Sequence, residues 1–140
     1  MPTAKVSVDV NLSAERLFSN LGDFTGIKVE GMAKSIKTSG SGVGALRDIV
    51  LGTGGRVLER CDNYDANSRT LTYSIINDDH PLPFKHYVAT LIVTPVGADS
   101  CRVDWWGNFD VKSGTEEDAL KMARGIYTGL IKGAQKQLAS

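Results

Sequence analysis

The chain has 140 residues, of which 41% are hydrophobic, and this is enough for one domain that buries roughly two thirds of its unfolded surface. Its 16 basic and 16 acidic residues cancel, so no net charge attracts nucleic acid or an anionic membrane. We therefore expect a single domain over residues 1–140 and neither of these partners.

The cysteine positions and the hydropathy of the chain argue against several further classes of protein. Cys61 and Cys101 are far apart and have no histidine pair nearby, so neither a zinc site nor a redox motif is indicated. We expect two free core thiols and no cofactor. No run approaches the ~18 apolar residues of a membrane span, and Met1–Val10 alternates like a strand and has no long apolar stretch of a signal peptide. The sequence predicts a soluble, cytoplasmic protein.

The N-terminal part predicts a strand and two short helices. Lys5–Val10 places its valines on one face, with the period of a half-buried strand. Ser13 is a suitable N-cap for a helix that Gly22 ends. Asp23 can cap a second short helix through Ile27.

The middle of the chain predicts an antiparallel meander, because apolar β-type segments alternate with glycine, proline and aspartate turns. The predicted strands are 33–39, 44–51, 56–64, 69–76, 86–95 and 100–111. With the N-terminal strand, the sheet has about seven strands.

The C-terminal segment predicts a long helix. Thr115 and Asp118 form a variant of the capping box, and the helical pattern continues to about Leu138. The predicted apolar stripe is Ala119, Met122, Ala123, Ile126, Leu130 and Ala134. A single long helix facing a curved antiparallel sheet, an α+β fold, buries that stripe economically.

Three glycines repeat every four residues beside this stripe, at Gly125, Gly129 and Gly133. Each costs roughly 1 kcal/mol relative to alanine inside a helix. One hypothesis is close packing against the sheet or another helix. The other is that the missing side chains leave volume for a ligand between helix and sheet.

Arg47 and Glu59 are charged residues inside apolar strand patterns joined by Gly52–Gly55. Burying either charge alone costs several kcal/mol, so an internal pair or a polar ligand is needed if they face inward. A connecting loop of odd length places Glu59 on the face of Arg47, whereas an even loop places Arg60 there. The spacing alone leaves both loops open.

Four short segments carry a resemblance to a known family. They are Leu21-Gly22-Asp23-Phe24, Gly44-Ala45-Leu46-Arg47-Asp48, Leu58-Glu59-Arg60 with Asp65, and Cys101 to Phe109. Together with the order of the elements, they resemble the polyketide cyclase/dehydrase and lipid-transport group of the START and birch-pollen-allergen (Bet v 1-like, SRPBCC) superfamily over essentially the whole chain. The resemblance implies a helix-grip fold, in which a seven-stranded curved antiparallel sheet wraps around the C-terminal helix and two short helices follow the first strand.

Two branches of that superfamily look similar locally. Lachrymatory factor synthase uses a pocket arginine and glutamate, whose positions Arg47 and Glu59 match, and this favours the odd loop. In the plant abscisic acid receptors, a gate loop corresponds to Gly52–Gly55 and a latch loop to His80-Pro81-Leu82. Gly52–Gly55 lacks the S-G-L-P-A sequence of the receptors' gate, and Pro81 stands where the receptors' latch has an arginine. Hormone binding and phosphatase binding are therefore not implied for this chain.

The resemblance implies an inward-facing set of residues around a pocket. Arg47 and Glu59 are the candidate catalytic residues. The candidate ligand-binding residues are Ile49, Leu51, Val57, Tyr73, Ile75, His80, Leu82, Tyr87, Ala89, Leu91, Trp105, Ile126 and Leu130. Apolar walls with a few convergent polar groups are typical of small-molecule sites.

The remaining aromatic residues and histidines are interpreted from their local patterns. Trp105 shares the more apolar face of its strand and is predicted inside, whereas an exposed Trp106 would indicate a possible homodimer or partner surface. Tyr127 lies at the border of the helical stripe. His80 sits in a polar loop, where a solvated histidine is the default, and His86 is interpreted as structural.

Three functions remain open. The first is binding or transport of a small hydrophobic or amphipathic molecule. The second is an enzyme of the cyclase, dehydratase or isomerase type, in which Glu59 moves a proton and Arg47 holds an anionic intermediate. The third is an interaction module whose loops at Gly52–Gly55 and Asp78–Pro83 close on a ligand.

Overall fold

The structure is a computed structural model that describes residues 1–26 and 33–139. Seven strands form one antiparallel sheet in the order β1-β7-β6-β5-β4-β3-β2. The strands are β1 (Thr3–Val10), β2 (Ala33–Ser39), β3 (Leu46–Leu51), β4 (Arg56–Asp65), β5 (Thr70–Ile75), β6 (Phe84–Gly97) and β7 (Ser100–Val111). The two helices are α1 (Ala14–Leu21) and α2 (Glu116–Leu138).

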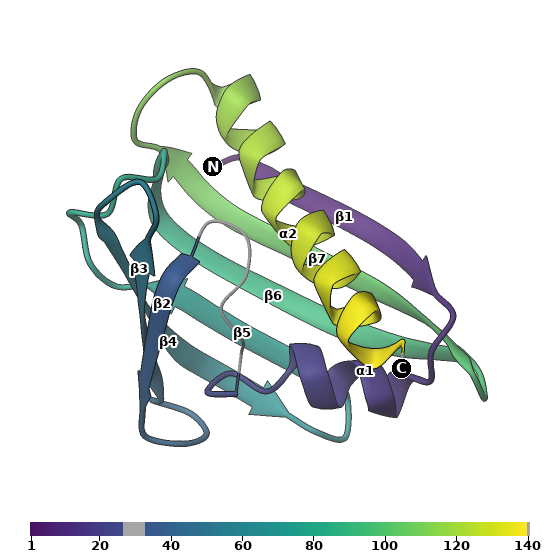
Figure 1. Ribbon diagram of the computed structural model, residues 1–140. Helices are drawn as coiled ribbons and strands as arrows, with labels where there is room; N and C mark the ends of the chain where they lie inside the picture. Colours follow the sequence, from purple (N-terminus) through teal and green to yellow (C-terminus); the bar gives the residue numbers. More distant parts are fainter. Residues whose placement is uncertain (27–32, 140) are drawn as a thin grey trace.

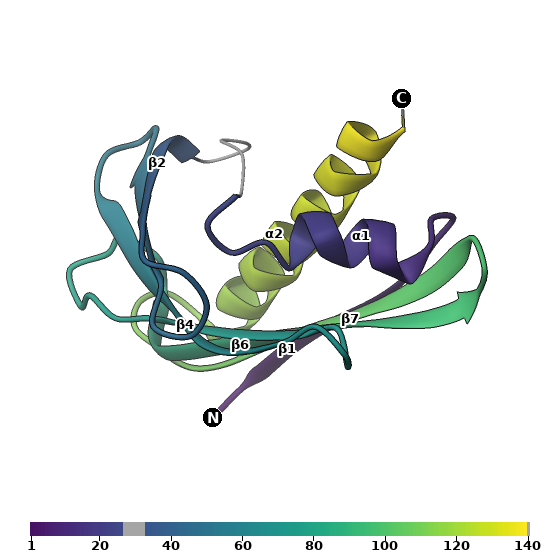
Figure 2. The ribbon, with the colours of Figure 1, turned by 90° about the horizontal axis from the view of Figure 1, so that it is seen from below.

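Both helices lie on one side of the sheet. Figure 2 shows the sheet curling toward the helices at the end formed by β2, β3 and β4. The long helix α2 runs diagonally across the sheet (Figure 1) and contacts β1 and β7. This arrangement confirms the α+β helix-grip fold that the sequence predicted.

Local capping signals set the limits of α1. The Ser13 side chain accepts a hydrogen bond from the backbone N–H of Arg16 at 3.2 Å, and Gly22 forms the C-cap. The second short helix, predicted from Asp23 through Ile27, does not form in residues 23–26, and Ile27 lies outside the described residues.

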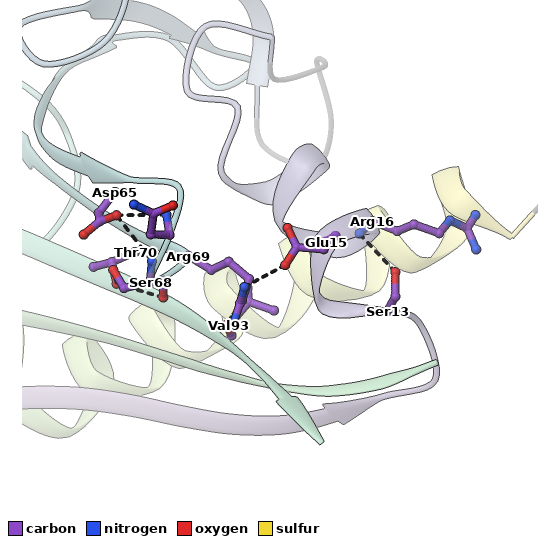
Figure 3. A network of polar contacts seen from close by, with 9 residues as sticks. Ser13, Glu15, Arg16, Asp65, Ser68, Arg69, Thr70 and Val93 are labelled. Carbon is purple, nitrogen blue, oxygen red and sulfur yellow. Dashed lines mark hydrogen bonds and ion pairs between the residues drawn. The ribbon is translucent and has the colours of Figure 1, made fainter. Parts of the chain in front are cut away.

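Polar contacts hold α1 against the sheet and the end of α2. Arg69 donates to Glu15 at 2.6 Å and to the Val93 carbonyl at 3.0 Å. Figure 3 shows Arg69 between these two residues. Arg16 donates to the carbonyl of Leu138 at 2.9 Å. Exposed ion pairs contribute less than about 1 kcal/mol each, so these contacts mainly fix the position of α1.

The buried face of α2 differs from the predicted stripe. The buried residues are Ala119, Ala123, Tyr127, Ile131, Gly133 and Ala134. Tyr127, placed at the border by the sequence, is 0% exposed, whereas Met122 is 41% exposed. The stripe is confirmed at Ala119, Ala123 and Ala134, whereas Met122 was wrong. The reason is that α2 has two neighbouring apolar faces, and a hydropathy pattern does not say which of them packs on the sheet.

The loop between β3 and β4 decides which charges share a face. The backbone N–H of Leu51 donates to the Gly55 carbonyl at 3.0 Å, so residues 52–54 form the connection. Gly54 and Gly55 have φ values of 99° and 83°, which favour glycine. The loop is therefore odd, and Arg47 pairs with Glu59 across the two strands.

Candidate functional site

A cavity of about 400 Å³ lies between the curled part of the sheet and α2. Its wall is mainly apolar. The lining residues are Ala33, Ile36, Arg47, Ile49, Leu51, Val57, Glu59, Tyr73, Ile75, Leu82, Phe84, Tyr87, Met122, Gly125, Ile126, Gly129 and Leu130. This size lies within the range of small-molecule sites, roughly 300–1,000 Å³.

Arg47 and Glu59 form a buried ion pair in the cavity wall. Arg47 is 5% exposed and Glu59 is 8% exposed, and Nε of Arg47 donates to Oε1 of Glu59 at 2.5 Å. Nη1 also donates to the Phe24 carbonyl at 3.3 Å. The guanidinium carbon lies 4.1 Å from the ring centre of Phe24 and 5.1 Å from that of Tyr73. The two rings add cation–π attraction and hold the arginine in place.

The pair leaves hydrogen-bonding capacity unused. Among the described residues, neither Nη2 of Arg47 nor Oε2 of Glu59 has a hydrogen-bond partner. The pair can therefore offer one donor and one acceptor to a molecule in the cavity.

Tyrosine hydroxyls provide a second polar region. The hydroxyls of Tyr87 and Tyr127 lie 2.5 Å apart, and Tyr73 lies beside them with its ring 6.2 Å from that of Tyr87. Burial raises the pKa of all three tyrosines above the ordinary value. They therefore remain protonated near neutral pH and act through hydrogen bonds.

A smaller hollow of about 230 Å³ adjoins the cavity on the side of α1. Arg47 and Leu130 line both spaces. Asn20 of α1 donates to Gln137 of α2 at 2.9 Å across this hollow's wall. The Arg47 side chain thus lies at the boundary between an apolar space and a more polar one.

A model of the polyketide cyclase / dehydrase and lipid transport family matches residues 1–139. The chain belongs to this family. The match confirms the resemblance to the polyketide cyclase/dehydrase and lipid-transport group.

Solved structures agree with the family's fold. An uncharacterized protein from Bacillus thuringiensis is 25% identical with a TM-score of 0.84, covering 99% of this chain and 100% of that one. XoxI from Bacillus cereus is 25% identical with a TM-score of 0.86, covering 100% and 97%. Norcoclaurine synthase from Thalictrum flavum, in complex with dopamine and hydroxybenzaldehyde, is 18% identical with a TM-score of 0.76, covering 99% and 86%. This last likeness shows the fold alone. No curated protein sequence matches the chain.

The structure brings most of the candidate site residues of this family member to the main cavity. Leu91 and Trp105 line the smaller hollow instead. Ala89 is buried in the core, and neither it nor His80 lines either space. Sequence reasoning missed Ala33, Ile36 and Phe84, whose apolar strand pattern carries no signal that separates a cavity wall from ordinary core.

His80 is buried and not solvated, so its default interpretation was wrong. It is 4% exposed, and its Nδ1 accepts a hydrogen bond from the N–H of Leu82 at 3.2 Å. Its carbonyl accepts from Lys112 Nζ at 2.5 Å. Burial and the nearby Lys112 charge lower its pKa. The histidine orders the loop that carries Leu82 to the cavity.

Trp105 is buried, as predicted, whereas Trp106 is partly exposed with the Lys5 ammonium 5.6 Å from its ring centre. Cys61 and Cys101 are free and buried. In residues 1–26 and 33–139, no three His, Cys, Asp or Glu side chains are grouped to hold a metal ion. Within the described part of the chain, no helix has both the length and the apolar character needed to cross a membrane.

Gly125 and Gly129 border the cavity, and a Cβ atom built on either would meet nothing within 4 Å. Close packing therefore does not explain these two glycines. The open space supports the alternative, that missing side chains leave volume beside α2.

Replacing both glycines by alanine should raise the free energy of unfolding by about 1 kcal/mol each, because alanine is the better helix former. Urea denaturation measures the change. Gly42→Ala is the control: it also has open space, but its φ is 63°, so alanine should destabilise there. Destabilisation by the two α2 alanines would show that these glycines serve packing.

Proposed function

We propose that this protein binds a small, uncharged, amphipathic molecule in the 400 Å³ cavity. The observation that carries the proposal is a charge-balanced Arg47–Glu59 pair in a mainly apolar wall, with Nη2 of Arg47 and Oε2 of Glu59 making no hydrogen bond to residues 1–26 or 33–139. The apolar part of the ligand covers the aliphatic wall. Its polar part meets the pair.

The charge balance is the reason for an uncharged ligand. Arg47 and Glu59 already neutralise each other at 2.5 Å. A ligand carboxylate placed beside them would add a buried charge without a counterion, and desolvating such a charge is costly. A hydroxyl, carbonyl or amide instead satisfies Nη2 of Arg47 or Oε2 of Glu59 at little electrostatic cost.

A fluorescent probe tests the proposal. N-phenyl-1-naphthylamine, which is uncharged and amphipathic, should bind the wild-type protein with enhanced emission. Leu130→Trp should weaken binding at least tenfold, because the indole occupies the boundary between the cavity and the smaller hollow. The control is Arg124→Trp, on an exposed part of α2, which should bind normally. Equal binding by both variants would place the site elsewhere.

Glu59 also favours a second candidate, an enzyme of the cyclase, dehydratase or isomerase type. A buried carboxylate with one oxygen that accepts no hydrogen bond from the described residues, beside a fixed cation, can exchange a proton with a bound molecule while Arg47 stabilises the negative charge that develops. Glu59→Gln keeps the shape and removes the base. If the protein is an enzyme, turnover of the ligand, once isolated, should be lost with little change in affinity.

A further inference from the structure

His80 holds the backbone at two residues of the cavity wall. Leu82, in the loop between β5 and β6, and Phe84, at the start of β6, both line the cavity. Nδ1 of His80 accepts a hydrogen bond from the backbone N–H of Leu82 at 3.2 Å. The same ring makes a hydrogen bond with the backbone of Phe84. One buried imidazole therefore fixes the chain at both wall residues.

These two hydrogen bonds determine where the ring carries its proton. Taken alone, the contact with Phe84 raises the pKa of His80, so the ring donates in this contact and the Phe84 carbonyl accepts. A neutral imidazole has a single N–H, and Nδ1 is already the acceptor for Leu82, so the proton is on Nε2. Only the neutral ring in this tautomer makes both hydrogen bonds.

A second proton on the ring would disrupt the loop. Protonated Nδ1 becomes a donor that faces the N–H of Leu82, so that hydrogen bond is lost. The new charge would also be buried, because His80 is 4% exposed. Nζ of Lys112 donates to the carbonyls of Asp78 and His80 at 2.7 and 2.5 Å, so a positive charge is already fixed beside the ring.

The charged groups around the ring act in both directions. Burial, the largest cause, and the Lys112 ammonium lower the pKa of His80, whereas Asp78, Asp79 and the backbone contact raise it. The net result is a pKa below the ordinary value of 6.5. The loop 52–55, which packs on this loop where Gly55 meets Pro81, contains no titratable residue.

The sign of the pH dependence follows from the lowered pKa. Above the ordinary value of 6.5, His80 is neutral in both the ordered and the disordered loop, so the ordered loop has its full stability. As the pH falls below that value, the disordered loop binds a proton that the ordered loop does not. The ordered loop therefore loses stability until the pH reaches the lowered pKa of His80.

We propose that protonation of His80 releases Leu82 from the cavity wall, so that the protein holds its ligand at neutral pH and releases it in acid. The inference rests on the proposed function and adds regulation of the same site. Only the neutral ring supports the closed wall, so ligand binding and proton binding at His80 oppose each other.

The pH dependence of probe binding tests this inference. N-phenyl-1-naphthylamine stays uncharged, and its dissociation constant is measured between about pH 7.5 and about pH 4.5, a range that spans the titration of histidine. In the wild type it should rise at least about threefold and no more than about tenfold per pH unit. In His80→Asn, where Oδ1 replaces the acceptor Nδ1 and takes up no proton, the same ratio should stay near one.

His86→Asn is the matched control, because the chain has two histidines and His86 is exposed and bonded to Asp110 at 2.9 Å. It should keep the wild-type pH dependence. Equal pH dependence in His80→Asn and the wild type, or its loss in His86→Asn, would overturn the inference. If the probe binds with the same affinity at every pH, the inference fails and the proposed function stands; if it does not bind at neutral pH, the proposed function fails.

A measurement on the wild-type protein covers the case in which the His80 variant does not fold. Nitrogen NMR of histidine-labelled protein should show Nδ1 of His80 without a proton at neutral pH. As the pH falls, the amide resonance of Leu82 should shift with the same midpoint as the His80 ring. A proton on Nδ1 at neutral pH, or a Leu82 amide that does not respond to the His80 titration, would contradict the inference.

Discussion

Replacing Arg47 by methionine should lower the free energy of unfolding by about 3–5 kcal/mol, because it leaves the Glu59 carboxylate buried without its partner. The guanidinium also contacts the rings of Phe24 and Tyr73, so its packing is lost as well. Urea denaturation at neutral pH measures the loss.

Two further variants isolate the cause. Arg47→Met with Glu59→Leu should recover most of the stability, because the uncompensated charge is removed as well. Arg56 and Asp48 form a bidentate pair between the same two strands but are much more exposed. Arg56→Met should therefore cost less than about 1 kcal/mol. Similar losses at the two arginines would show that the Arg47–Glu59 pair is effectively solvated.

Replacing Gly107 by alanine should destabilise the protein by about 1–3 kcal/mol or more, because the core has no room for the methyl group. A Cβ at Gly107 would lie 3.2 Å from a Tyr87 ring carbon and would clash severely with the Tyr127 hydroxyl. Either α2 moves away from β7 or the Tyr87–Tyr127 hydrogen bond breaks. Thermal unfolding measures the loss.

The same substitution in a Tyr127→Phe background tests whether the hydroxyl is the obstacle. Removing that oxygen leaves neighbours no closer than 3.2 Å, so Gly107→Ala should cost clearly less there than in the wild type. Equal costs in the two backgrounds would mean that backbone effects at Gly107 dominate. The difference between the costs of Gly107→Ala in the two backgrounds would then be zero, and it would not support a Tyr127 hydroxyl fixed beside Gly107.

The parts of the fold that depend on neighbouring residues could be predicted from the sequence. Ser13 and Thr115 cap their helices through backbone groups three residues away, and such local signals are visible in the chain. The pairing of Arg47 with Glu59 was harder. It depends on whether the β3–β4 loop is odd, and the positive φ values of Gly54 and Gly55 decide this.

The parts of the site that depend on distant contacts could not be predicted. His80 is buried because Lys112 and the loop close around it, and no local pattern indicates that contact. Ile126 and Tyr127 are adjacent, yet the first lines the cavity and the second packs in the core. A cavity produces no periodic pattern in the sequence. Only Gly125 and Gly129, which lack side chains beside the apolar stripe of α2, indicated that space.

A small molecule held beneath α2 against the Arg47–Glu59 pair should lie beside the methyl groups of the cavity wall. Intermolecular nuclear Overhauser effects between N-phenyl-1-naphthylamine and methyl-labelled protein test this most directly. We expect contacts to the methyl groups of Ile49, Val57 and Ile126, which line the cavity, and none to Val50 or Val88, which are exposed. Contacts confined to the two exposed valines, or none at saturating probe, would contradict it.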